Sequence, residues 1–252
     1  MITIRGGASV AGVHNGTWKA RRRGLLIGAA AGIAGPAVFT IAWVVAGLRQ
    51  PGRSLAAAQI SGLAADDAHD PWIMMSGFAV LGGCAVVFGA GLANALGGRR
   101  TAGPGPALIQ VAGVLTVAAG LLRRDHVLLT AGPASWHNHA HDVVSAASYL
   151  LLVAAPVVLA RRLARNQRWR RLPVPLAVAA CLSGGLLIVF YASPHQGWDG
   201  TLQRIAVSLP LAAVTTVAAR LARLAGATSP MVEPEKAHVP FPGGPPRSGS
   251  SP

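Results

Sequence analysis

The sequence is short of charge, and above all of acid. Only 12% of its 252 residues are charged and only eight are Asp or Glu, whereas soluble domains devote about a quarter of their residues to charge. Cysteine is scarce too: Cys84 and Cys181 lie in separate apolar runs, a pattern that supplies neither a disulfide framework nor a zinc motif. These shortages exclude an ordinary soluble domain and a fold built on cysteine.

Long apolar runs take the place of the missing charge. The chain is 52% hydrophobic, and its mean hydropathy is +0.47. Six uncharged stretches each cover about 22–40 Å as a helix, against a hydrocarbon core of about 30 Å. Because lipid offers no partner to backbone groups, these stretches must be helical, and we predict an all-α fold, a bundle of six transmembrane helices. The stretches are Gly24–Leu48, Trp72–Gly98, Pro106–Leu122, Val143–Ala160, Pro173–Ser193 and Ile205–Ala219.

The distribution of basic residues predicts the topology. A net charge of +14 suggests nucleic acid in a soluble protein, but 17 of the 22 Lys and Arg residues fall before the first stretch, in alternate loops or after the last. The positive-inside rule then places both termini of a multi-pass cell-membrane protein in the cytoplasm, and we expect no nucleic-acid partner. The opposite side holds only Arg49, Arg53, Arg123, Arg124 and Arg204.

The same topology divides the chain into three parts. Residues 1–23 form a cytoplasmic amino-terminal segment, residues 24–224 the six-span domain, and residues 225–252 a disordered cytoplasmic tail rich in Pro, Gly and Ser. An aromatic belt is expected at the two interfaces. Its members are Trp72, Trp136 and Trp198 outside and Trp169 inside.

The remaining polar residues concentrate on the outer side. Six of the eight acidic residues and six of the eight histidines fall there, in three loops or at their junctions with helices. The acidic residues are Asp66, Asp67, Asp70, Asp125, Asp142 and Asp199; the histidines are His69, His126, His137, His139, His141 and His195.

Two histidines at the start of the fourth span have the spacing of metal ligands. His137 and His141 are four residues apart and share a face of a helix, where neutral imidazoles on adjacent turns can hold one ion, zinc being the candidate. Asp125, Asp142 or His195 would add a ligand or orient an imidazole. The alternative is that a loop preceding a membrane helix is ordinarily polar and solvated.

Two more residues are candidates for chemistry. Ser61 lies in the outer loop Arg49–Pro71, within a stretch, Ser54–Asp67, expected to form a short interfacial helix. A serine near His and Asp can serve as a nucleophile, although a lone serine is usually inert. Arg204 opposes the positive-inside trend and needs an acidic partner or a ligand phosphate or carboxylate, unless it snorkels into the headgroups.

An ordered series of short motifs resembles the bacterial and archaeal membrane family called domain of unknown function 998. The resemblance covers roughly residues 24–224 and supports the fold and the motif positions, without supplying an activity. This chain departs from the family pattern at Arg53, at Gly62 and at Arg123-Arg124. The motifs are Gly32–Pro36 with Phe39, Arg49–Gly52, Ile60–Leu63, Gly77-Phe78, Asp125, His137, His141-Asp142 and Gln203-Arg204.

Two functions compete at this point. The first is a metal-dependent hydrolase acting on a lipid-like small molecule at the outer leaflet; Ser61, Asp125 and the His137/His141 pair resemble the polar residues of the alkaline-ceramidase type of zinc hydrolase. The second is a non-enzymatic binding, transport or accessory protein of the lipid bilayer. The almost purely apolar helix centres argue against an ion path.

Overall fold

The computed structural model describes residues 10–98, 100–128, 133–192 and 197–227, and it contains six long helices and two short 3-10 turns there. No strand occurs within these ranges, so the prediction of an all-α fold is confirmed for them. The helices follow the six apolar stretches. They are α1 (Val10–Leu48), α2 (Pro71–Ala95), α3 (Gly105–Leu121), α4 (Trp136–Leu163), α5 (Pro173–Ala192) and α6 (Asp199–Ala227), with η1 (Ser61–Ala64) between α1 and α2 and η2 (Gln167–Trp169) between α4 and α5.

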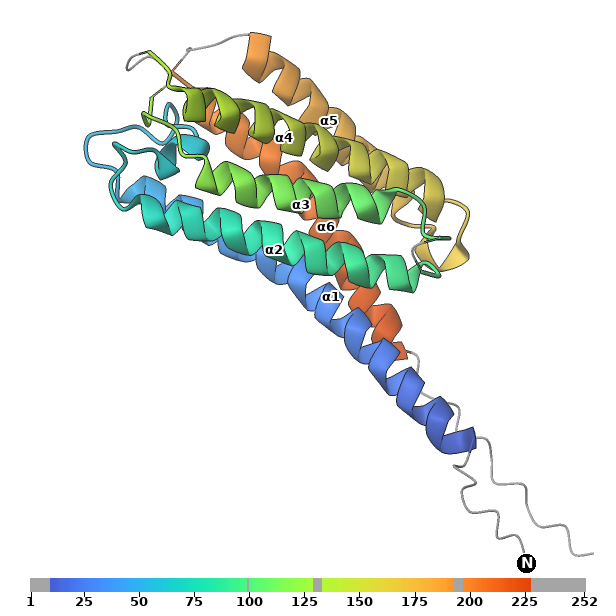
Figure 1. The fold of residues 1–252 in the computed structure, drawn as a ribbon. Coiled ribbons are helices and arrows are strands. Elements are labelled where there is room, and N and C mark those ends of the chain that lie inside the picture. Colours follow the sequence, from blue (N-terminus) through green and yellow to red (C-terminus); the bar gives the residue numbers. More distant parts are fainter. Residues whose placement is uncertain (1–9, 99, 129–132, 193–196, 228–252) are drawn as a thin grey trace, which may run out of the picture.

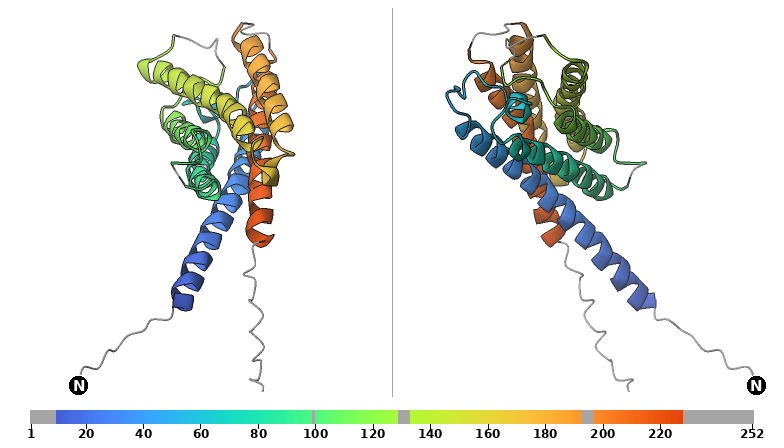
Figure 2. Two further views of the ribbon diagram at one scale, coloured as in Figure 1. Left: turned by 90° about the vertical axis from the view of Figure 1, so that its right-hand side faces the viewer. Right: turned by 60° about the vertical axis from the view of Figure 1, so that its left-hand side comes forward.

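Five of these helices are long and apolar enough to cross a membrane, and α3, with 17 residues, is a shorter apolar helix. Each helix packs against its neighbour in the sequence, and α6 closes the bundle against α1 (Figure 1). Helix α1 runs past the ends of its neighbours at its amino-terminal side (Figure 2). The result is an antiparallel helical bundle with the long α1–α2 connection at one end and the α2–α3 and α4–α5 connections at the other.

Glycines allow the helices to approach one another closely. A Cβ on Gly28 of α1 would lie 2.8 Å from the Cα of Gly91 in α2, and one on Gly113 of α3 would lie 2.6 Å from the carbonyl oxygen of Gly82 in α2. Such contacts between small residues are typical of helices that pack in lipid, where dispersion and close fit replace the hydrophobic effect.

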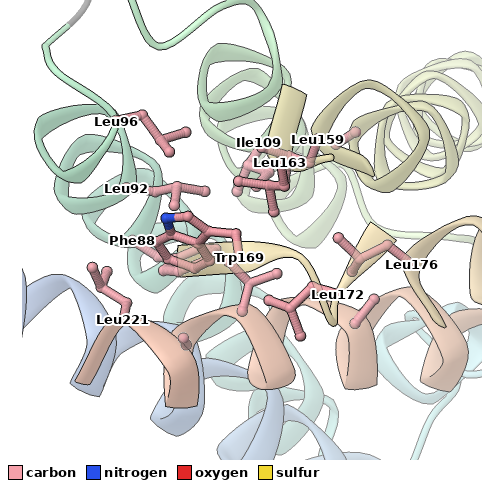
Figure 3. Close-up of a cluster of buried hydrophobic side chains, with 14 of the residues drawn as sticks. Phe88, Leu92, Leu96, Ile109, Leu159, Leu163, Trp169, Leu172, Leu176 and Leu221 are labelled. Atoms are coloured by element: carbon pink, nitrogen blue, oxygen red, sulfur yellow. The ribbon is translucent and has the colours of Figure 1, made fainter. Parts of the chain in front are cut away.

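One end of the bundle, which we call the arginine end, comprises the turns of α1 that begin at Trp18, the carboxyl-terminal ends of α2 and α6, and η2. Its core holds Trp169, which is only 3% exposed and lies among leucines of α2, α4 and α6 (Figure 3). The expectation that Trp169 belongs to an interfacial belt is therefore wrong. The α4–α5 connection turns inward, so that the Trp169 indole is packed between the helices at this end of the bundle.

The opposite end, which we call the polar end, comprises residues 49–70, residues 122–128 and 133–135, and the first turns of α4 and α6. Its α1–α2 loop folds into the bundle, where Ile60 and Leu63 are at most 1% exposed and pack with Phe39, Met74 and Phe78. The expected interfacial helix over Ser54–Asp67 is therefore wrong, since only Ser61–Ala64 is helical and it is buried. The loop can be buried because side chains of α6 satisfy its backbone, as described below.

Candidate functional site

Ion pairs occupy most of the charged groups at the polar end. Four Arg–Asp ion pairs and three His–Asp contacts are found among the described residues, all at this end, and four of its five arginines pair with an aspartate. The shortest joins Arg49 to Asp70 at 2.6 Å, and this contact lowers the pKa of Asp70. The pairs are Arg49–Asp70, Arg53–Asp67, His69–Asp70, Arg123–Asp66, Arg124–Asp142, His126–Asp67 and His137–Asp125. Much of the aspartate at this end is thus neutralised by arginine, and three histidines lie against the same carboxylates.

Asp125 fixes the start of α4. Its two carboxylate oxygens accept hydrogen bonds from the backbone N–H of Ser135 at 2.6 Å and from the Ser135 hydroxyl at 2.7 Å. Ser135 is in turn the N-cap of α4 and accepts from the backbone N–H of Asn138. The hydrogen bonds from Ser135 hold the pKa of Asp125 below its usual value.

The two histidines of α4 lie against the end of α3, as their shared helical face predicts. His137 Nδ1 is 3.0 Å from the carbonyl oxygen of Arg123, and His141 Nδ1 is 2.8 Å from that of Ala119 and 2.6 Å from that of Leu122. Because a carbonyl only accepts, each Nδ1 carries the proton. Both rings therefore cap otherwise unpaired carbonyls at the end of α3 and keep Nε2 for another partner.

The two Nε2 atoms have different partners. His137 Nε2 lies 3.5 Å from Asp125, and with Asp66 these residues place three possible ligand atoms within 4.8 Å of one another. His141 Nε2 instead accepts from the Ser145 hydroxyl at 3.1 Å. In the described part of the chain, the three-residue group that could hold a metal does not include His141.

This group fits zinc only in part. A histidine whose Nδ1–H is held by a carbonyl is a typical oriented ligand, and His137 meets that condition. However, the Arg123 guanidinium lies 3.0 Å from Asp66, so a cation would have to displace it. Catalytic zinc ordinarily has three protein ligands, whereas here the ion pair leaves only His137 and Asp125.

A cavity of about 180 Å³ lies beside His141, which is one of its lining residues. Arg124 is its most buried charge: the residue is 5% exposed, its Nη1 donates to Gln59 Oε1 at 2.8 Å, and its Nη2 lies 3.8 Å from Asp142. Burial lowers the pKa of Arg124, but a guanidinium stays charged. The lining residues are Gln59, Ser61, Arg124, His141, Asp142, Ser145, Tyr149, Phe190, Tyr191, Asp199 and Gln203.

The walls of this cavity are held by amide side chains. Gln203 of α6 accepts from the backbone N–H of Ile60 at 2.6 Å and donates to the Tyr149 hydroxyl at 3.1 Å. Gln59, 4% exposed, uses its oxygen on Arg124, while its Nε2 has no hydrogen-bond partner. A buried amide with idle donors is costly unless something else accepts from it.

Arg204 of α6 holds the α1–α2 loop in place at the polar end. Its Nη1 donates to the carbonyls of Leu55 and Ala58, at 2.6 Å and 2.8 Å, and the guanidinium lies over the Trp43 ring at 5.2 Å. The described residues contain no ion pair of Arg204 with Asp125 or Asp199. Backbone carbonyls and an aromatic face take the place of the expected carboxylate.

The five residues singled out from sequence therefore fall into three places. Asp125 and His137 lie 3.5 Å apart and do not line the cavity, Ser61 and His141 line it, and Arg204 holds the α1–α2 loop. His195 lies outside the described residues. Sequence reasoning missed several residues of the cavity that the structure brings together, among them Arg124, Gln59, Tyr149 and Tyr191. The tyrosines carried a signal, because they are the only two in the chain.

The apolar helices and the polar loop-rich end define a multi-pass helical membrane protein. The family follows from comparison: the sequence model described as "Protein of unknown function (DUF998)" matches residues 33–220. The chain belongs to this family, and the resemblance noted in its motifs is confirmed. No curated protein and no solved structure matches the chain.

Proposed function

We propose that the protein crosses the bilayer six times, with its polar end outside, and binds the headgroup of a lipid-like molecule in the cavity beside Arg124. The observation that carries this proposal is that one cavity is lined by a buried guanidinium, Arg124, and by the buried amide of Gln59, whose Nε2 has no hydrogen-bond partner among the described residues. Both groups only donate at these atoms. They call for a ligand that accepts, such as a phosphate or carboxylate.

The cavity also suits hydroxyl groups and an apolar tail. Asp142 is half exposed and accepts hydrogen bonds, and Tyr191, at 58% exposure, stands at the rim beside Phe190. A site with a few convergent polar groups and aromatic walls orients a small amphiphile by its polar part. A molecule at the outer leaflet of the membrane would present its headgroup at this depth.

The proposed orientation depends on the distribution of charge, and the proposed number of spans depends on whether α3 can cross the bilayer. The 17 basic residues on one side against five on the other favour cytoplasmic termini in the cell membrane. Helix α3 is about 26 Å long, slightly less than the hydrocarbon core, and a modest local thinning accommodates it. The domain limits follow as before: residues 1–23 and 225–252 in the cytoplasm, and residues 24–224 in and around the bilayer.

The second candidate function is a zinc-dependent hydrolase of the same lipid-like class. The observation that favours it is the group formed by Asp66, Asp125 and His137, which lies near the cavity that contains Ser61. A bound zinc ion would supply an activated water for cleavage of an acyl bond. Asp125 and His137 would hold the ion, and Arg123 would have to release Asp66.

Native mass spectrometry of the purified protein tests the first proposal. We expect the parent to carry an amphiphile that Arg124→Gln loses and that the control Arg49→Gln, at an exposed ion pair, retains. Loss from both variants, or from neither, would remove Arg124 from the binding site. Elemental analysis of the same samples separates the two functions: one zinc per chain, lost in His137→Ala, would favour the hydrolase.

A further inference from the structure

The arginine end carries a second concentration of charge, of one sign. Two adjacent cavities of about 360 and 470 Å³ open there, and both are lined by Arg168 and Trp169. Together seven arginines line them, and no Asp or Glu belongs to either lining among the residues the structure describes. The arginines are Arg21, Arg22, Arg168, Arg170, Arg171, Arg220 and Arg223.

Three of these arginines have a structural role. The Arg22 Nε donates to the carbonyl of Ala225 at 3.2 Å, and Arg220 donates to that of Arg168 at 3.0 Å through Nε and at 2.6 Å through Nη2. Arg21 likewise reaches a carbonyl near the end of α2. These contacts cap the carboxyl-terminal ends of helices and turns, where cations are favoured.

The other four guanidinium groups have no such role. Across the described ranges, the side chains of Arg168, Arg170, Arg171 and Arg223 form no hydrogen bond or ion pair with the protein. Like charges gathered around a cavity repel one another and raise the local potential. An external anion is the group that would relieve this repulsion.

Trp169 fixes where these charges stand. Its indole is buried among leucines of α2, α4 and α6 (Figure 3), so the flanking Arg168 and Arg170 are held at the mouth of the bundle. Beside them Leu25 and Leu221 line the first cavity. The cavities thus combine several guanidinium groups with an apolar wall at the ends of membrane helices.

We infer that the arginine end binds the phosphate of an anionic phospholipid headgroup. Guanidinium groups match the oxygens of a phosphodiester in geometry and charge, and basic pockets between helices at a membrane surface are suited to such headgroups. A free phosphate offers the same chemistry to the arginines but leaves the leucine wall unused. The apolar wall therefore favours the lipid.

The test uses the full chain in detergent micelles, titrated with phosphatidylglycerol and, separately, with phosphatidylcholine and inorganic pyrophosphate, while the melting temperature is followed. The double variant Arg168→Gln/Arg223→Gln removes two idle charges. The matched control Arg161→Gln/Arg165→Gln removes two exposed charges near the same end, which line neither cavity, and leaves the same net charge.

Phosphatidylglycerol should raise the melting temperature of the parent and of the control at similar concentrations. The site variant should need about thirty-fold more lipid, because each Lys or Arg near an anionic bilayer surface is worth about fivefold in binding. Equal responses of the two variants would overturn the site. Stabilisation by pyrophosphate without phosphatidylglycerol, or equally by phosphatidylcholine, would overturn the assignment to an anionic lipid. Should the site variant not fold, Arg168→Lys/Arg223→Lys keeps the charges and should bind more weakly than the parent; unchanged binding would equally count against a guanidinium site.

Discussion

Arg124 is the residue whose removal should disturb the polar end most. In Arg124→Gln the hydrogen bond from Nη1 to Gln59, at 2.8 Å, is lost; a hydrogen bond from a charged group contributes about 1.5–3 kcal/mol. The pair with Asp142 adds little, because the Asp142 side chain is 49% exposed and 3.8 Å away, and such pairs are worth under about 1 kcal/mol. We therefore expect the free energy of unfolding to fall by about 2–3 kcal/mol.

The assay is reversible unfolding in mixed micelles of increasing dodecyl sulfate content, followed by tryptophan fluorescence. Arg49→Gln is the control, because the Arg49 side chain is 54% exposed and its pair with Asp70 faces solvent. We expect it to cost less than about 1 kcal/mol. If Arg124→Gln costs no more than Arg49→Gln, the buried network around the cavity does not exist as described.

Three further predictions concern the α1–α2 loop, the response of stability to pH, and the topology. Gly62→Ala should destabilise the protein by about 1–3 kcal/mol, because the added Cβ would collide with the carbonyl of Val127; Gly83→Ala, in open space on α2, should not destabilise it in the same assay. The pKa of Asp125 is lowered in the folded protein, so its ionised form stabilises the fold. This contribution is complete at pH values above the unfolded pKa of about 3.9, and it is lost as the pH falls toward the lower folded pKa. The melting temperature of the parent should therefore drop more steeply below about pH 4 than that of Asp125→Asn, and parallel curves would contradict this. An alkaline phosphatase fused after Pro252 should be inactive and a fluorescent protein fused there should be bright, and the reverse pattern would invert the topology.

The helices could be predicted from sequence because the bilayer leaves a chain few choices. An uncharged stretch such as Trp72–Gly98 must satisfy its own backbone, and α2 occupies Pro71–Ala95 accordingly. Composition also placed the polar residues at one end, since their loops alternate with spans. These inferences need only local chemistry and the thickness of the membrane.

Contacts between distant residues could not be predicted in the same way. The sequence around Ile60 predicted an interfacial helix. Its burial could not be predicted, because it depends on Gln203 and Arg204, about 140 residues further along the chain. Spacing grouped His137 with His141, whereas their Nε2 atoms face Asp125 and Ser145. Residues four apart share a helical face, but neighbouring elements decide what each side chain meets.

The central claim is that the cavity beside Arg124 holds the headgroup of a lipid-like molecule. A cryo-electron microscopy structure of the protein in nanodiscs made with lipid from the native membrane tests it most directly. We expect non-protein density in the cavity, with its polar end within about 3 Å of the Arg124 guanidinium and of Gln59 Nε2. A cavity filled by rearranged side chains, or holding water alone, would contradict the claim.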